Sequence, residues 1–179
     1  MANDTDTDAR KPGEIDRRPA RLSALVALGA GALAALAAVL TGSAGVIGAA
    51  IGMAALAPGV VLGSRRLVHI GAVGLFGGLV FAGATGTAPA AELLMLVGTT
   101  GTVLAWDVGQ NAIGIGEQLG RGADTSRAEL AHVGGSTVVG ILTAGSAFGV
   151  YQVATEGQPL TALALMILAV VILTTALRQ

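Results

Sequence analysis

The sequence has no cysteine, little charge and a single tryptophan, and two of these scarcities exclude whole classes of protein. Without cysteine, the chain has neither disulfide bonds nor thiolate metal sites. Charged residues make up 12% of the 179 residues, whereas a soluble domain carries about 25%. The net charge of −1 gives no overall field that would attract nucleic acid. These deficits indicate a membrane protein that has no nucleic-acid partner.

Motifs of nucleotide or metal chemistry are also missing. The sequence contains neither the G-x-x-x-x-G-K-[ST] of a P-loop nor the H-E-x-x-H of zinc proteases. Gly114 and Gly116 begin a pattern like a dinucleotide fingerprint, but the third glycine, Gly120, falls one residue late. His69 and His132 are more typical of hydrogen-bonded structural residues than of a metal pair or a pH sensor. We therefore predict no catalytic residue, no cofactor and no metal.

The hydrophobic residues gather in six runs, each close to the about 20 residues that cross a bilayer as a helix. The predicted fold is all-α: a polytopic membrane bundle of six transmembrane helices arranged as three hairpins. The predicted spans are residues 22–40, 44–63, 67–86, 90–106, 133–153 and 160–177.

The positive charges predict the orientation of the chain. All ten Lys and Arg residues fall in one of four places: before the first span, between spans two and three, between spans four and five, or after the sixth span. Basic residues near span ends stay in the cytoplasm, so both termini are predicted to be cytoplasmic. Residues 1–21, which are mostly polar, are predicted to be a disordered cytoplasmic tail. Residues 22–179 form a single membrane domain in this interpretation.

Glycines at close spacing indicate how the helices pack, because small residues let backbones approach each other in lipid. They predict a tight bundle and are compatible with a homo-oligomer. A weak similarity between residues 67–86 and 130–149 leaves an internal duplication open. The glycines in question are the pairs Gly74 and Gly78, and Gly145 and Gly149, together with Gly45, Gly48 and Gly52.

Residues 107–132 interrupt the apolar chain and are predicted to form a cytoplasmic helix-turn-helix. The first helix continues the fourth span and stops at the glycines around Arg121. Asp124 or Thr125 then caps a short helix over residues 126–132.

The first helix of this segment has distinct faces. Glu117 and Arg121 are spaced for an i, i+4 ion pair. One predicted apolar stripe consists of Val108, Ala112, Ile115 and Leu119. A second line, of small residues suited to close packing, consists of Ala105, Gly109, Ala112, Gly116 and Gly120.

The run WDVGQNAIGIGEQLGR, followed by DTSRAELAH and a glycine-rich span, resembles a group of small multi-pass membrane proteins of haloarchaea. That family has no assigned function. The resemblance implies genes that lie beside those of AAA-type ATPases, von Willebrand-A-like proteins and transglutaminase-like proteins. It therefore implies a cell-surface or assembly complex, and it names no catalytic residue. The excess of Arg over Lys and the Asp-rich tail also fit a halophile.

The leading hypothesis is a non-enzymatic integral membrane protein that serves as a subunit or anchor of a larger assembly. Its partners would be the lipid bilayer and either another protein or a second copy of the chain, docked on residues 107–132. The predicted partner-binding residues are Trp106, Asp107, Gln110, Asn111, Glu117, Gln118 and Arg121.

Two other functions stay open at this point. The first is a channel or facilitator for a small neutral solute, lined by hydroxyls such as that of Thr100 and by glycine backbone. The second is a membrane enzyme that uses Asp107 and Glu117 on lipid headgroups. These two carboxylates lie about 15 Å apart along a helix, which is too far for them to act on one bond as a pair.

Overall fold

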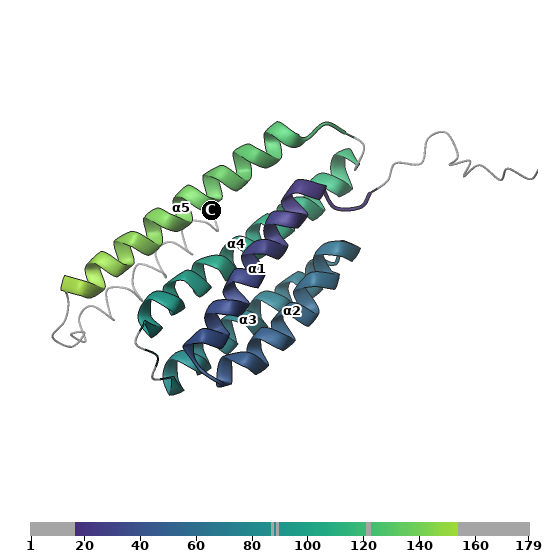
Figure 1. Ribbon diagram of the computed structural model, residues 1–179. Helices are drawn as coiled ribbons and strands as arrows, with labels where there is room; N and C mark the ends of the chain where they lie inside the picture. The colour runs from purple at the N-terminus through teal and green to yellow at the C-terminus, as the bar shows by residue number, and fades with distance from the viewer. Residues whose placement is uncertain (1–16, 87, 89, 121–122, 154–179) are drawn as a thin grey trace, which may run out of the picture. The chain divides into compact units, whose positions relative to one another are not determined.

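The computed structural model describes residues 17–86, 88, 90–120 and 123–153. This part of the chain contains five α-helices and no strand (Figure 1). Each helix is long and apolar enough to cross a membrane, consistent with a multi-pass membrane protein. The helices are α1 (Arg21–Thr41), α2 (Ala44–Leu62), α3 (Arg65–Thr85), α4 (Ala91–Leu119) and α5 (Ser126–Val153).

The all-helical fold and five of the expected apolar helices are thus confirmed. The sixth predicted span, residues 160–177, lies outside the described residues, as do residues 1–16 of the predicted tail. The count of six helices, the three-hairpin arrangement and the side of the termini therefore stay predictions.

Two short breaks show how the sequence ends one helix and begins the next. α2 ends at Gly63, whose φ of 72° is in the left-handed region that favours glycine. Ser64 follows directly, and its Oγ accepts a hydrogen bond from the backbone N–H of Leu67 to cap α3. α4 ends at Gly120, which also has a positive φ, of 74°. This helix therefore ends where the sequence indicated.

Close packing of α2 against α3 depends on glycine. A Cβ atom at Gly48 would overlap the Cα of Gly78, and one at Gly52 would lie 2.7 Å from the backbone N of Leu75. Real Cβ atoms do not approach backbone so closely, so larger residues would separate the helices. The packing predicted from the glycines of residues 45–52 and 74–78 is confirmed. The pair Gly145 and Gly149 lies in the second compact unit described below, and its predicted role stays a prediction.

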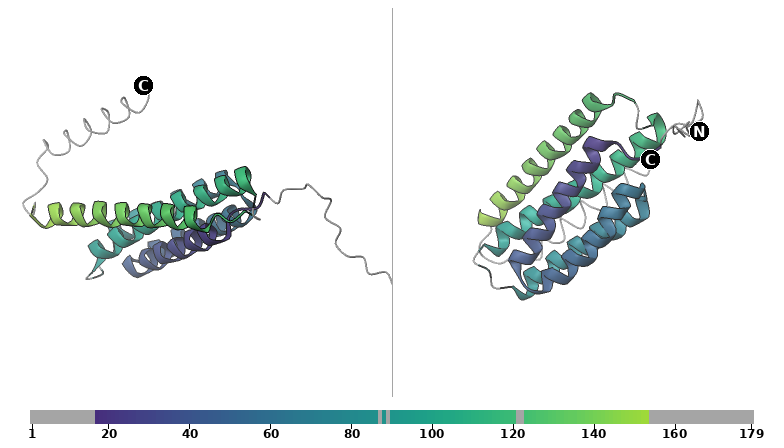
Figure 2. Two further views of the ribbon diagram at one scale, coloured as in Figure 1. Left: turned by 90° about the horizontal axis from the view of Figure 1, so that it is seen from above. Right: turned by 45° about the vertical axis from the view of Figure 1, so that its right-hand side comes forward.

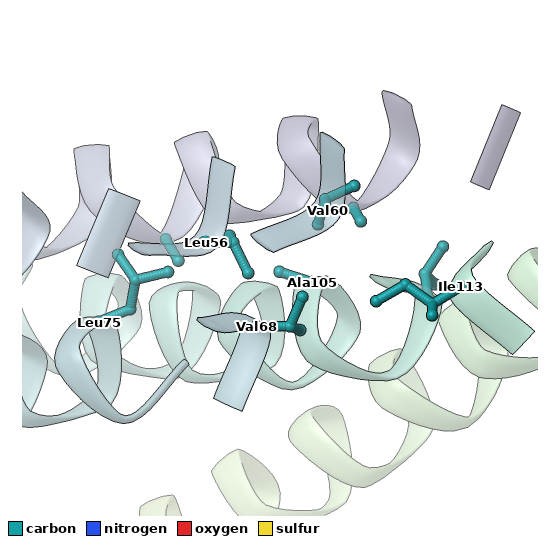
Figure 3. Close-up of a cluster of buried hydrophobic side chains, with 9 residues drawn as sticks. Leu56, Val60, Val68, Leu75, Ala105 and Ile113 are labelled. Atoms are coloured by element: carbon teal, nitrogen blue, oxygen red, sulfur yellow. The ribbon is translucent and has the colours of Figure 1, made fainter. Parts of the chain in front are cut away.

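The centre of the α1–α4 bundle is filled mainly from α2 and α3 (Figure 3). Their aliphatic side chains point between the helices. α1 contributes two alanines, and α4 contributes Ala105, Val108 and Ile113. Figure 2 shows the same four helices side by side from two further directions. The labelled core residues are Leu56 and Val60 of α2, Val68 and Leu75 of α3, and Ala105 and Ile113 of α4.

The fifth helix differs from the prediction in its length. α5 runs without a break from Ser126 to Val153, so the short helix expected over residues 126–132 is its first part. The chain divides into two compact units at Thr143, and only the part of α5 before that point belongs to the unit that holds α1–α4. In that part the apolar side chains of Val139 and Leu142 are exposed, as those of a helix facing lipid would be.

The α2–α3 contact predicts that Gly48→Ala lowers the stability of the bundle by about 1–3 kcal/mol, because its Cβ must displace backbone. Gly77→Ala is the matched control, since a Cβ there meets no atom within 4 Å among the described residues. Unfolding of the purified protein in mixed micelles, titrated with sodium dodecyl sulfate, measures both variants. Equal stability of the two variants would contradict the packing.

Candidate functional site

The candidate site lies at one end of the α1–α4 bundle, where α1, α3 and α5 begin and α2 and α4 end; we call it the polar end. α4 has 29 residues, which span about 43 Å at 1.5 Å per residue. The hydrocarbon core of a bilayer is roughly 30 Å thick, so about nine residues of α4 extend beyond that thickness. Residues 107–119 are helical throughout, which confirms that this stretch continues the fourth apolar helix.

The line of small residues predicted along α4 is its packing face. All of its members are buried. In Figure 1 the start of α1 lies beside the end of α4, and the residues just before α1 continue this contact. The backbone N–H of Ala20 donates to the carbonyl of Ala112 at 3.0 Å. A Cβ at Gly116 would lie 3.0 Å from the Cα of Pro19 and would overlap the carbonyl of Arg18.

The predicted apolar stripe is correct only in its first half. Val108 is fully buried, but Ile115 is half-buried and the side chain of Leu119 is 58% exposed. Ile113 is buried in their place. The reason is that α3 begins level with Gln110, so its packing surface does not reach the last turns of α4.

The first polar cluster joins the start of α3 to α4. The guanidinium of Arg65 donates from Nη1 to Oε1 of Gln110 at 3.1 Å and from Nη2 to Oε2 of Glu117 at 2.8 Å. Both members of the ion pair are about half exposed, so the pair contributes at most about 1 kcal/mol to stability. Glu117 therefore pairs with Arg65 of another helix, whereas Arg121, its expected partner, lies outside the described residues.

An aromatic pair lies beside this cluster. The indole Nε1–H of Trp106 donates to Nδ1 of His69 at 3.1 Å, and the rings meet edge to face with centroids 5.5 Å apart. The side-chain nitrogen of Gln110 lies 3.1 Å from the same Nδ1. An indole nitrogen can only donate, so Nδ1 must be the acceptor and the imidazole carries its proton on Nε2.

The second polar cluster joins α4 to α5. Ser136 Oγ donates to Oδ2 of Asp107 at 2.6 Å, and Nε2 of His132 lies 3.0 Å from the same oxygen. The three residue types are those of a serine hydrolase, but here the carboxylate lies between the other two. In a Ser-His-Asp triad the histidine is hydrogen-bonded to the serine, whereas Ser136 here donates to Asp107. The amide nitrogen of Asn111 is buried and has no hydrogen-bond partner within the described part of the chain.

A buried carboxylate of α5 caps α1. Glu129 is 4% exposed, and its Oε2 accepts from the backbone N–H of Ser23 at 2.7 Å. Its Oε1 accepts from the hydroxyl of Thr125 at 2.8 Å. The N-cap residue of α1, Ala20, has no side chain that could do this. The carboxylate therefore satisfies a free N–H at the first turn of α1 and lies where the helix dipole favours negative charge.

Two of the hydroxyls that could line a channel, those of Thr100 and Thr102, are bonded within their own helix. Thr100 donates to the carbonyl of Leu96 and Thr102 donates to that of Gly98, both at 2.8 Å. A hydroxyl has one proton to donate, so neither is a free donor for a solute. No group of three or more His, Cys, Asp or Glu side chains that could hold a metal ion occurs in the described ranges.

Sequence reasoning identified the α4 side of these clusters and missed their partners. The predicted site residues did not include Arg65, His69, Ser136 or Glu129. Each of these lies within about the first three turns of α3 or α5. The signal that could have found them is the gathering of polar residues at helix ends that the six-span arrangement places on one side.

Comparison with known proteins gives one match. The sequence model of a family described as a family of unknown function, DUF7519, matches residues 17–174. No curated protein matches the chain. No solved structure matches it.

The cap on α1 predicts that Glu129→Ala lowers stability by about 1–3 kcal/mol, because a buried N–H loses a charged acceptor. Glu117→Ala, which removes the exposed pair with Arg65, is expected to cost less than about 1 kcal/mol. Thermal unfolding of both variants in the same detergent measures the difference. A larger loss for Glu117→Ala would show that the exposed cluster, and not the cap, holds the polar end together.

Proposed function

This chain belongs to DUF7519, a family of unknown function, and we propose its function from its own residues. We propose that it is a non-enzymatic multi-pass membrane protein that acts as a subunit or anchor of a larger membrane assembly. A protein partner docks at the polar end, on residues 107–132, and both chain termini lie on the cytoplasmic side.

The observation that carries this proposal is the uncovered end of α4. Trp106, Asp107, Gln110 and Glu117 form hydrogen bonds or ion pairs within the chain. Their role is therefore to hold α4 in place against α3 and α5. This leaves the last turn of α4 and the start of α5 as the surface for a partner.

That surface, which we call the tip, consists of the exposed residues Gln118 and Leu119 of α4 and Arg127 and Ala128 of α5. No side chain of these four residues forms a hydrogen bond or an ion pair with the described residues. The side chain of Leu119 is 58% exposed, in the part of α4 that exceeds the thickness of the hydrocarbon. Covering such a side chain with a partner gains about 1.5–3 kcal/mol, and the amide of Gln118 beside it can form specific hydrogen bonds.

Three further observations support the anchor role. Five apolar helices could cross a membrane, and the distribution of Lys and Arg favours a cytoplasmic location for the polar end. The resemblance to haloarchaeal membrane proteins encoded beside ATPases adds an assembly context. The structure gives no comparable support to a channel, because Thr100 and Thr102 use their protons within α4.

A photocrosslinking residue at Gln118 tests this function, and one at Gln110 is the matched control because Gln110 is bonded to Arg65. In native membranes we expect the probe at position 118 to capture a discrete protein, or a second copy of the chain, and the probe at 110 to capture little. Capture at neither position, with the protein folded, would refute docking at the tip. Equal capture at both positions would refute the proposal that the partner binds the tip and not the residues that are bonded within the chain.

A further inference from the structure

A second exposed surface of the polar end lies on the first turns of α3. Arg66 is exposed, and its side chain forms no hydrogen bond or ion pair with any residue that the structure describes. His69 lies three residues later on the same helix and is also exposed. Side chains at i and i+3 of a helix are neighbours, with Cβ atoms about 5–6 Å apart. The sequence therefore places an unpaired cation beside an imidazole.

The imidazole is held so that it presents a donor. Trp106 Nε1–H donates to its Nδ1 at 3.1 Å, which leaves the proton of His69 on Nε2. No partner of Nε2 occurs among the described residues. Trp106 thus fixes the tautomer of His69, and the exposed imidazole carries its Nε2–H on the same face of α3 as Arg66.

The two carboxylates of α4 near this end of the bundle are already bonded to other residues. Glu117 is engaged by Arg65, and Asp107 accepts from Ser136 and contacts His132. The positive charge of Arg65 is thereby offset, and that of Arg66 is not. The local charge is positive at the start of α3, where a helix that crosses a membrane enters it.

We propose that Arg66 and His69 bind the phosphate of an anionic membrane lipid, with Trp106 set at the depth of the headgroups. Tryptophan gathers at membrane–water interfaces, and arginine binds phosphate through charge-assisted hydrogen bonds. A lipid phosphate at this level meets both donors while its acyl chains lie along the apolar face of α3, where Val73 and Phe76 are exposed. This site rests on the membrane placement in the proposed function and not on partner docking.

Trp106 is the only tryptophan of the chain, so its fluorescence reports on this site alone. The full chain, purified in a neutral detergent, is titrated with short-chain phosphatidylglycerol, with phosphatidylcholine of the same chain length, and with inorganic phosphate. We expect phosphatidylglycerol to change the fluorescence of Trp106 in a saturable way. Half-saturation with phosphatidylcholine is expected at a roughly tenfold higher concentration. A tenfold change corresponds to about 1.4 kcal/mol, which is close to the lower end of the range for one hydrogen bond to a charged group.

Arg66→Gln is expected to raise the half-saturating concentration of phosphatidylglycerol about tenfold, while Arg127→Gln, which removes an exposed arginine of α5, leaves it unchanged. Native mass spectrometry of the same samples checks retention of the lipid without relying on fluorescence. The proposal is overturned if both lipids bind alike, or if Arg127→Gln weakens binding as much as Arg66→Gln. Saturation by inorganic phosphate at the same concentration would also overturn it, because the site would then bind free anions. None of these results depends on whether a partner is captured at Gln118.

Discussion

Close contact between the backbones of α1 and α4 is the constraint on which the rest of the structure depends. In lipid, apolar surfaces gain little by leaving their surroundings, so helices associate through van der Waals contact and need small residues where they meet. α4 supplies such residues from Gly98 to Gly116, and α1 meets them with Ala27, Gly31 and Ala34, all buried. A Cβ at Gly101 would lie 3.0 Å from the carbonyl oxygen of Ala30, so a larger residue there would force the two helices apart.

The seam also explains why a polar stretch interrupts an apolar chain without breaking the helix. α1 begins at Arg21, yet α4 continues its small-residue face against the backbone of Arg18 and Pro19. One face of α4 therefore packs in the same way along the whole helix, while its other faces change from apolar to polar. The polar side chains on these faces bond to α3, as Glu117 does to Arg65. The last turn of α4 remains exposed.

Patterns in the sequence predict those features that depend on one helix at a time. Hydropathy predicts the apolar helices, and periodicity predicts both the continuation of α4 and its buried line of small residues. Neither predicts which helices exchange polar contacts: Glu117 and Arg65 are 52 residues apart, and only the nearby Arg121 is visible as a partner in the sequence. The burial of Ile113 in place of Ile115 depends on where α3 begins beside α4, which is a property of the packed bundle.

The proposed function requires α4 to leave the membrane as one unbroken helix with its last turn in water. Because the chain lacks cysteine, single spin labels at Val103→Cys and Leu119→Cys in liposomes test it directly; both positions are exposed in the bundle. The account predicts that collisions with oxygen dominate at position 103 and that collisions with a water-soluble nickel complex dominate at position 119. Oxygen-dominated relaxation at both positions would place the end of α4 in lipid and contradict the account.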